Sequence, residues 1–225
     1  MVDINAFPYM CFVRFELVNK EFDHQFNIHF DDHIHELANR PGYSTAWRTR
    51  ELRGVYNEGV MEQEYQQIYA ISDPALFKSF PQNPPPPIME SEPWRRDIGN
   101  WGRVFYRALS LIEKDSRAGR CWARCESNFR GAAAEETRFQ SESVRHLKRV
   151  LELPGIHRAW QLQHAPHSAQ IGPDPVGKYM NLFEADAPEN LLDPSLGEDR
   201  LPLKAGQEFA GRHFARLLSK AEPRR

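Results

Sequence analysis

Two histidines four residues apart, His29 and His33, have the types and the spacing needed for acid–base chemistry. Apolar residues recur at helical spacing from position 22 to position 37, and His33 falls on the same helix side, one turn after His29. An imidazole that is neutral near pH 7 can take a proton from a substrate. The pair could instead ligate a metal or a haem iron, or His33 could be satisfied inside the core. We predict His33 as the base and His29 as a second catalytic residue beside it. We predict no metal, because no third ligand is evident.

An arginine and a glutamate share one face of the expected strand at residues 10–17, namely Arg14 and Glu16. The segment that begins at Cys121 repeats the pattern with Arg124. A buried arginine is costly unless it is paired, so each Arg–Glu set is either a structural ion pair or an anchor for a substrate anion or carbonyl. We predict Arg14 as a catalytic anchor, and Glu16 and Arg124 as substrate-binding residues.

Aromatic residues with polar atoms recur along the expected strands. Tyr65 and Tyr69 share a strand face, and Tyr179 is the counterpart of Tyr65 in the second half of the chain. A tyrosine hydroxyl could donate to a developing oxyanion, although many such tyrosines only pack. Trp47 and Trp160 could flank a flat aromatic ligand. We predict Tyr65 as a hydrogen-bond donor, and the other four as substrate-binding residues.

The sequence repeats itself with a period near 110 residues. Four matching segments, here called anchors, occur in the same order in both halves, and chance is a poor explanation for all four. They are 11–16 with 121–126, His33 and Pro41-Gly42 with His146 and Pro154-Gly155, 65–69 with 179–183, and 102–110 with 211–219. Two copies predict a duplicated domain rather than a solenoid.

Each half predicts the order β-α-β-β-(α)-β, a ferredoxin-like arrangement. In the first half the helix is expected at 21–38 and the strands at 10–17, 43–51, 64–71 and 103–110. Irregular insertions are expected at 78–101, which is proline-rich, and at 187–210. One half leaves a sheet face uncovered, so residues 1–112 and 120–225 are predicted to pack together as one intramolecular α+β barrel with its helices outside.

The segment from Phe26 to Trp47 resembles the EthD-like branch of the dimeric α+β barrel superfamily. Helices of that branch carry an acidic residue, a histidine and, eight positions later, Pro-Gly-aromatic, as in Asp32-His33 and Pro41-Gly42-Tyr43. The second half keeps His146 but has Arg145 at the acidic position. The resemblance implies a barrel that relatives build from two chains, with pockets between a helix layer and the sheet. Members include cofactor-free monooxygenases, lactone isomerases, aromatic polyketide cyclases and haem-handling proteins.

Two geometries are compatible with these patterns. If the Arg14 face looks toward the helix at 21–38, then Arg14, His33 and Tyr65 line one pocket; if it looks into the barrel, His33 lies on the other side of the sheet. We favour the first geometry, because it supplies His33 with polar partners. His146 lies off the apolar stripe of its own helix and is expected to be exposed.

The composition excludes several classes of protein. Lys and Arg total 29 against 31 Asp and Glu, so the net charge of −2 offers no footprint for nucleic acid. No apolar run is long enough for a membrane span, and the first residues do not read as a signal peptide. Three cysteines are typical of reduced thiols, which predicts a cytoplasmic protein. No dinucleotide fingerprint, phosphate loop or nucleophile elbow occurs.

These patterns predict an enzyme that acts on a small apolar, aromatic or carbonyl-bearing molecule by acid–base chemistry, as an isomerase, cyclase, lyase or hydrolase. No cofactor is expected. The alternatives are a haem-binding protein of the same superfamily and a non-catalytic protein that binds a small ligand. Because one chain would supply both halves of the barrel, either a monomer or a homodimer is expected.

Overall fold

The computed structural model describes residues 2–52, 63–78, 98–115, 117–129, 131–175, 177–191 and 207–223. Most of the predicted insertions at 78–101 and 187–210 lies outside these residues, although strands already begin at Ile98 and Gln207, inside the expected insertions. No helix of the described ranges is long and apolar enough to span a membrane.

The two halves have the same order of strands and α-helices, as the sequence predicts, and the N-terminal half has one additional 3-10 helix before its α-helix. The N-terminal half contains β1 (Tyr9–Leu17), η1 (Lys20–Phe22), α1 (Asp23–Ala38), β2 (Tyr43–Glu51), β3 (Tyr65–Ile71), η2 (Pro74–Phe77) and β4 (Ile98–Glu113). The C-terminal half contains β5 (Cys121–Phe129), α2 (Ala133–Glu152), β6 (Ile156–His164), β7 (Tyr179–Ala185), η5 (Pro188–Leu191) and β8 (Gln207–Ala221). The origin of the halves by duplication stays a prediction.

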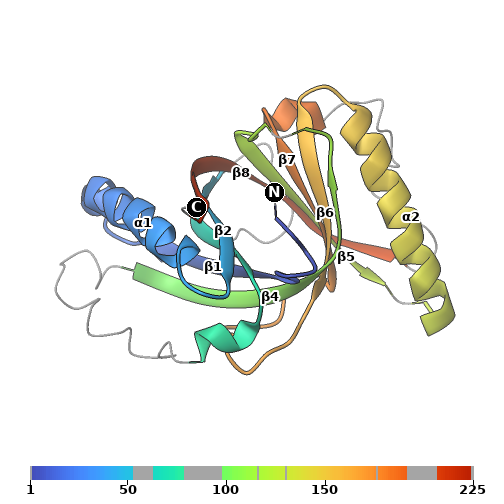
Figure 1. The fold of residues 1–225 in the computed structure, drawn as a ribbon, viewed down its shortest axis with the longest axis horizontal. Helices are drawn as coiled ribbons and strands as arrows, with labels where there is room; N and C mark the ends of the chain where they lie inside the picture. The colour runs from blue at the N-terminus through green and yellow to red at the C-terminus, as the bar shows by residue number, and fades with distance from the viewer. Residues whose placement is uncertain are drawn as a thin grey trace.

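The strands close into one antiparallel barrel in the order β1-β3-β2-β8-β5-β7-β6-β4 (Figure 1). The halves meet at two seams, where β2 pairs with β8 and β4 pairs with β6. Helices α1 and α2 lie outside the barrel on opposite sides (Figure 1). The architecture is therefore an α+β barrel within one chain.

Strand alternation divides the core into an inner layer and two outer layers. On β1, Cys11, Val13 and Phe15 pack against α1, whereas Met10 and Phe12 point into the barrel. The inner layer is centred on three stacked or tilted indoles, those of Trp47, Trp122 and Trp160. Each sheet face is therefore buried, one against a helix and one in the lumen.

The repeated Pro-Gly pair forms the turn between each helix and the next strand. Gly42 has φ of 85° and Gly155 has φ of 73°. This left-handed region is unfavourable for residues with a Cβ atom. A Cβ atom would also lie 2.8 Å from Leu76 Cδ1 at Gly42 and 2.7 Å from Asn190 Nδ2 at Gly155. The Pro-Gly pattern thus has a structural explanation in both halves.

We expect Gly42→Ala and Gly155→Ala each to lower the free energy of unfolding by about 1–2 kcal/mol, because the backbone must hold an alanine at positive φ. Urea unfolding measures the change. Gly172→Ala is the matched control: Gly172 has φ of 86° and no atom within 4 Å of its built Cβ, so it separates the backbone contribution from the packing contribution. Wild-type stability in Gly42→Ala and Gly155→Ala would contradict the explanation.

Candidate functional site

Arg14 lies inside the barrel and not beneath α1. It follows Met10 and Phe12 on the lumen face of β1, while His33 belongs to a helix outside the barrel. The prediction that Arg14, His33 and Tyr65 line one pocket is therefore wrong. The prediction placed Arg14 on the wrong face of β1. Successive residues of a strand point to opposite sides, so Arg14 faces the lumen, whereas Tyr65 lies on the helix side.

Arg14 and Arg124 belong to a buried ion network in the lumen. Arg124 Nη2 donates to Glu51 Oε1 at 2.7 Å, and Glu126 Oε1 lies 3.8 Å from Arg124 Nη1 and 4.0 Å from Arg14 Nη2. Gln66 donates to the same Glu51 oxygen. Because β1 and β5 lie opposite one another in the barrel order, the Arg14–Glu126 contact spans the lumen and joins the halves. Glu16, two residues beyond Arg14, is half-buried.

The three predicted tyrosines lie in the helix-facing layers, and each hydroxyl already donates to a side chain. Tyr65 donates to Asp23, Tyr69 to Gln67 and Tyr179 to Glu136. Burial raises the pKa of each phenol above its ordinary value, so all three are neutral donors at pH 7. A substrate would have to displace these contacts to reach the hydroxyls.

His29 and His33 lie along one flank of α1. The opposite flank faces β2, because Arg48 on β2 donates to the Asn27 carbonyl at 2.9 Å and to the Asp31 carboxylate. At about 100° per residue the two histidines lie on the far side of the buried stripe, toward β1 and β4. Their ring centroids are 6.1 Å apart.

A series of ring contacts leads from His33 to β4. The His33 ring lies 5.9 Å from Phe30, which stacks on Phe15 at 5.0 Å. Phe15 in turn stacks on Trp101 of β4 at 5.4 Å. The sheet side adjacent to the histidine flank is therefore aromatic.

Arg103, two residues after Trp101, lies on this side of the sheet. Only 2% of its surface is exposed. Its Nε donates to the Ala169 carbonyl at 2.8 Å, and its guanidinium carbon lies 4.9 Å from the Phe77 ring centroid. Within the described residues no carboxylate pairs with Arg103, and its Nη2 has no acceptor. A buried guanidinium without a counter-charge is unfavourable, so Arg103 is suited to receive an anionic or carbonyl oxygen from a ligand.

Further polar atoms without hydrogen-bond partners among the described residues surround Phe77 and Val13. The Tyr43 ring lies 6.0 Å from Phe77, and its hydroxyl has no partner. Gln67 Nε2 also has none, and both Gln67 and Arg103 are in register with Val13. Burial raises the pKa of the Cys11 thiol, against the opposing charge of Arg103. We call this set the Arg103 cluster: Cys11, Tyr43, Gln67, Phe77 and Arg103.

A segment of the C-terminal half crosses the Arg103 cluster. Residues 165–171, here the β6–β7 arm, pair with β4 through mutual backbone hydrogen bonds of 2.9 Å between Arg103 and Ile171. His167 of the arm contacts the Phe105 ring at 5.6 Å, and its Nδ1 accepts from the Ala169 amide at 3.1 Å. The neutral imidazole then carries its hydrogen on Nε2, which makes His167 a donor. Both halves therefore contribute to this region.

Sequence reasoning missed Arg103 as a functional candidate. The sequence did mark this residue, since Arg103 belongs to the repeated segment at 102–110. The prediction assigned the anchor role to the arginine of β1, and strand alternation places that residue on the other face.

His146 is buried, with 3% of its surface exposed, which corrects the prediction that it is exposed. The stripe of α2 that faces the sheet includes polar residues, and Ser143, one turn earlier, donates to Asn181 Oδ1 at 3.1 Å. A stripe defined by apolar residues alone therefore omitted His146.

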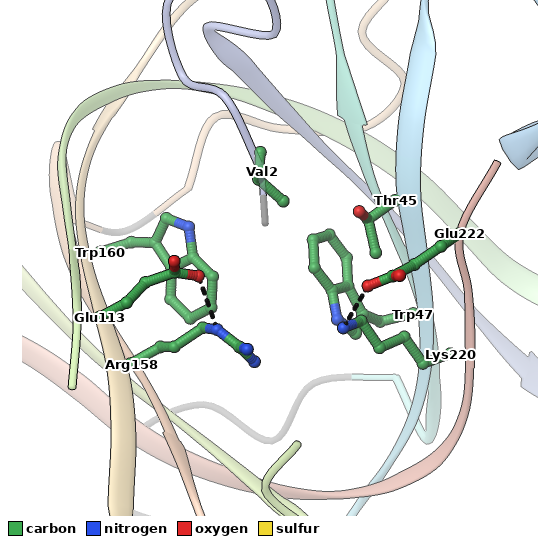
Figure 2. A pocket seen from close by; sticks show the side chains of 8 residues that line it. All are labelled: Val2, Thr45, Trp47, Glu113, Arg158, Trp160, Lys220 and Glu222. Atoms are coloured by element: carbon green, nitrogen blue, oxygen red, sulfur yellow. Dashed lines mark hydrogen bonds and ion pairs between the residues drawn. The ribbon is translucent and has the colours of Figure 1, made fainter. Parts of the chain in front are cut away.

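Trp47 and Trp160 face the lumen. They line a small pocket at one mouth of the barrel together with charged residues from both seams (Figure 2). The predicted site residues are thus distributed over three places: the lumen network, the helix-facing layers and this mouth. In the described ranges no group of three His, Cys, Asp or Glu residues could hold a metal ion.

No family model and no curated protein matches the sequence. Solved structures match along nearly the whole chain. An anthrone oxidase-like protein is 7% identical with a TM-score of 0.60, covering 98% of this chain and 95% of that chain. A candidate monooxygenase from Lactobacillus acidophilus is 7% identical with a TM-score of 0.58, covering 96% of each chain. A haem-binding protein from Thermus thermophilus is 8% identical with a TM-score of 0.50, covering 94% of this chain and 91% of that chain. At identities this low the likeness shows a shared fold alone.

Proposed function

We propose that the N-terminal half holds an active site between α1 and the β1–β4 side of its sheet, for proton transfer on a small aromatic or carbonyl-bearing molecule. The observation that carries this proposal is Arg103. It is a buried guanidinium with no carboxylate among the described residues, on the sheet side adjacent to the His29–His33 flank. In this site Arg103 replaces Arg14 as the anchor.

The proposed chemistry needs one base and one anchor. Arg103 would hold the carbonyl oxygen of the substrate, and His33 would remove a proton from the adjacent carbon. The electron pair of that C–H bond moves into the carbonyl and gives an enolate, whose oxygen the guanidinium stabilises. Return of the proton to a different carbon completes an isomerisation. Tyr43, whose hydroxyl has no partner in the described residues, would supply a second donor to the oxygen.

The proposal also includes the origin and setting of the chain. The repeated anchors and the shared order of strands and α-helices in the halves support a tandem fusion of two ferredoxin-like units. The Asp32-His33 and Pro41-Gly42-Tyr43 pattern supports the EthD-like branch. The three free, buried cysteines support a cytoplasmic location.

Proton exchange on a defined probe tests the activity. Phenylpyruvate combines an aromatic ring, a carboxylate, a carbonyl and an acidic methylene group. In D2O, loss of its methylene signal by proton NMR reports enolate formation, after subtraction of the rate in buffer. A protein-dependent rate supports the proposal. Absence of exchange with phenylpyruvate and with a panel of aromatic ketones would reject it.

We expect His33→Gln to lower the protein-dependent exchange rate by about 10²-fold, because a general base contributes roughly this factor. His35→Gln is the matched control, since His35 is an exposed histidine of the same helix and should leave the rate unchanged. An exchange rate in His33→Gln equal to that of His35→Gln would remove His33 from the mechanism.

A haem-binding protein is the second candidate, and the adjacent imidazoles of His29 and His33 favour it. His33 would be the iron ligand, the aromatic layer of Phe15 and Trp101 would contact the macrocycle, and Arg103 would pair with a propionate. Haem would supply redox chemistry. Titration with haemin should then produce a Soret band that His33→Gln removes and His35→Gln retains; no Soret shift in the wild type would exclude this candidate.

A further inference from the structure

We infer that Gln67 selects substrates in which a carboxylate is attached to the carbonyl carbon, that is, aromatic 2-oxo acids. Gln67 belongs to the Arg103 cluster, but it has no role in the proton transfer proposed for that site. Its amide nitrogen is one of the buried donors that lack an acceptor among the described residues. The inference rests on the proposed function, because it names the substrate class of the same site.

Gln67 and Arg103 lie on opposite sides of Val13, on the face of the sheet that packs against α1. Val13 of β1 is in register with Gln67 on β3 and with Arg103 on β4. Since neighbouring strands lie about 5 Å apart, the two backbones are separated by roughly 10 Å. Both side chains are 2% exposed and are longer than the valine between them. One small ligand group above Val13 can therefore reach both donors.

The orientation of the Gln67 amide is set by Tyr69. The Tyr69 hydroxyl donates to Gln67 Oε1, and burial raises the pKa of this phenol, so the hydroxyl keeps its hydrogen. The amide then presents Nε2, for which the described residues supply no acceptor. A buried N–H group without an acceptor is unfavourable, so this nitrogen calls for an oxygen from a ligand.

The positive charge of Arg103 is not balanced by its described neighbours. Its Nε donates to the carbonyl of Ala169, which is a neutral group. Burial lowers the pKa of Arg103, and the groups that act against this effect are the Cys11 thiol and the Tyr43 hydroxyl. Both are neutral at pH 7, because burial raises their pKa values. A ketone oxygen would satisfy one hydrogen bond here, but only an anion would also balance the charge.

An aromatic 2-oxo acid satisfies both requirements. Its keto oxygen and one carboxylate oxygen lie side by side, within reach of the planar guanidinium of Arg103, and the other carboxylate oxygen accepts from Gln67 Nε2. The rings of Phe77 and Phe105, with centroids 5.7 Å apart, offer an aromatic surface to the substrate ring. Proton transfer to His33 leaves the net charge of the site unchanged, because an imidazolium and an enolate form together.

Phenylglyoxylate is the probe for this inference. It carries the keto and carboxylate groups but has no hydrogen on the atoms next to the ketone, so its binding does not depend on proton transfer. By calorimetric titration we expect it to bind at least tenfold more tightly than acetophenone, which has a methyl group in place of the carboxylate, and than the neutral phenylglyoxamide. Equal affinities, or no binding of phenylglyoxylate, would overturn the inference. The expected preference without exchange of phenylpyruvate would reject only the proton transfer.

Gln67→Leu is expected to weaken the Kd of phenylglyoxylate by about tenfold, because it removes one hydrogen bond to a charged acceptor. Gln161→Leu is the matched control. Gln161 is a buried glutamine of the C-terminal half whose amide donates to the Gln140 carbonyl at 3.4 Å, so its removal should leave the Kd unchanged. Equal Kd values in the two variants would show that Gln67 does not contact the ligand.

Gln67→Glu tests the charge argument with little change in shape. The glutamate keeps an acceptor for Tyr69 and supplies Arg103 with a carboxylate before any ligand binds. We expect the preference to reverse, so that phenylglyoxamide binds more tightly than phenylglyoxylate. A glutamine that only packs would not produce this reversal. Retention of the wild-type preference in Gln67→Glu would contradict the inference.

Discussion

Arg103→Met is expected to lower the protein-dependent exchange of phenylpyruvate by about 10²–10³-fold, the range for loss of a donor that stabilises an oxyanion. The same change should leave the free energy of unfolding equal to that of the wild type or raise it by about 1 kcal/mol. Arg103 is buried without a carboxylate among the described residues, so its removal relieves an unfavourable buried charge. This gain offsets the loss of the hydrogen bond to the Ala169 carbonyl and of the contact with Phe77. Exchange kinetics and urea unfolding measure the two effects.

This combination distinguishes a functional arginine from a structural one. Arg107→Met is the matched control, because Arg107 lies on the same strand and is exposed. It should change neither quantity. If Arg103→Met lost stability and kept its exchange rate, Arg103 would be a structural residue and the proposed site would lose its anchor.

The second large effect concerns stability. Glu51→Ala is expected to lower the free energy of unfolding by about 3–5 kcal/mol, because it removes the carboxylate 2.7 Å from Arg124. Among the described residues Arg124 then shares a single carboxylate, Glu126, with Arg14. Both side chains of the Glu51–Arg124 pair are 2% exposed, so water cannot replace the lost contact. Urea unfolding at pH 7 measures the change.

Two further variants show whether the buried charge causes this loss of stability. Glu36→Ala removes the partner of Arg40 in an exposed ion pair one helix turn apart, and should cost less than about 0.5 kcal/mol. The double change Glu51→Leu with Arg124→Met removes both charges and should recover most of the lost stability. A double variant no more stable than Glu51→Ala would show that packing, rather than an excess of buried positive charge, explains the loss.

The order of the elements could be predicted from the sequence because its determinants are local. Apolar spacing along α1, alternation along β1 and the repeated Pro-Gly turns are properties of short segments. Closure of the barrel followed from one further argument, that a half alone leaves a sheet face uncovered. These arguments do not depend on which face of a strand looks inward.

The candidate site depended on that face, and the sequence carried little information about it. Cys11, Val13 and Phe15 are apolar and lie against α1, but Met10 and Phe12 are apolar too and lie in the lumen. When both faces of a sheet are buried, alternation loses its inside–outside signal. Arg14 was therefore assigned to the wrong layer, and Arg103 was not recognised. The burial of His146 has the same origin, since a polar residue can face a sheet when its neighbours there are polar.

The β6–β7 arm gives the single chain a freedom that a two-chain barrel lacks. The arm belongs to the C-terminal half but covers Arg103 in the N-terminal half. In a homodimer, a mutation in such a segment appears in both subunits and alters both sites at once. In one continuous chain the arm is encoded once, so a change in its length or composition over Arg103 leaves the N-terminal half of the sequence unaltered. The two halves are encoded separately, so mutations can make them different and the two sides of the barrel can diverge in specificity.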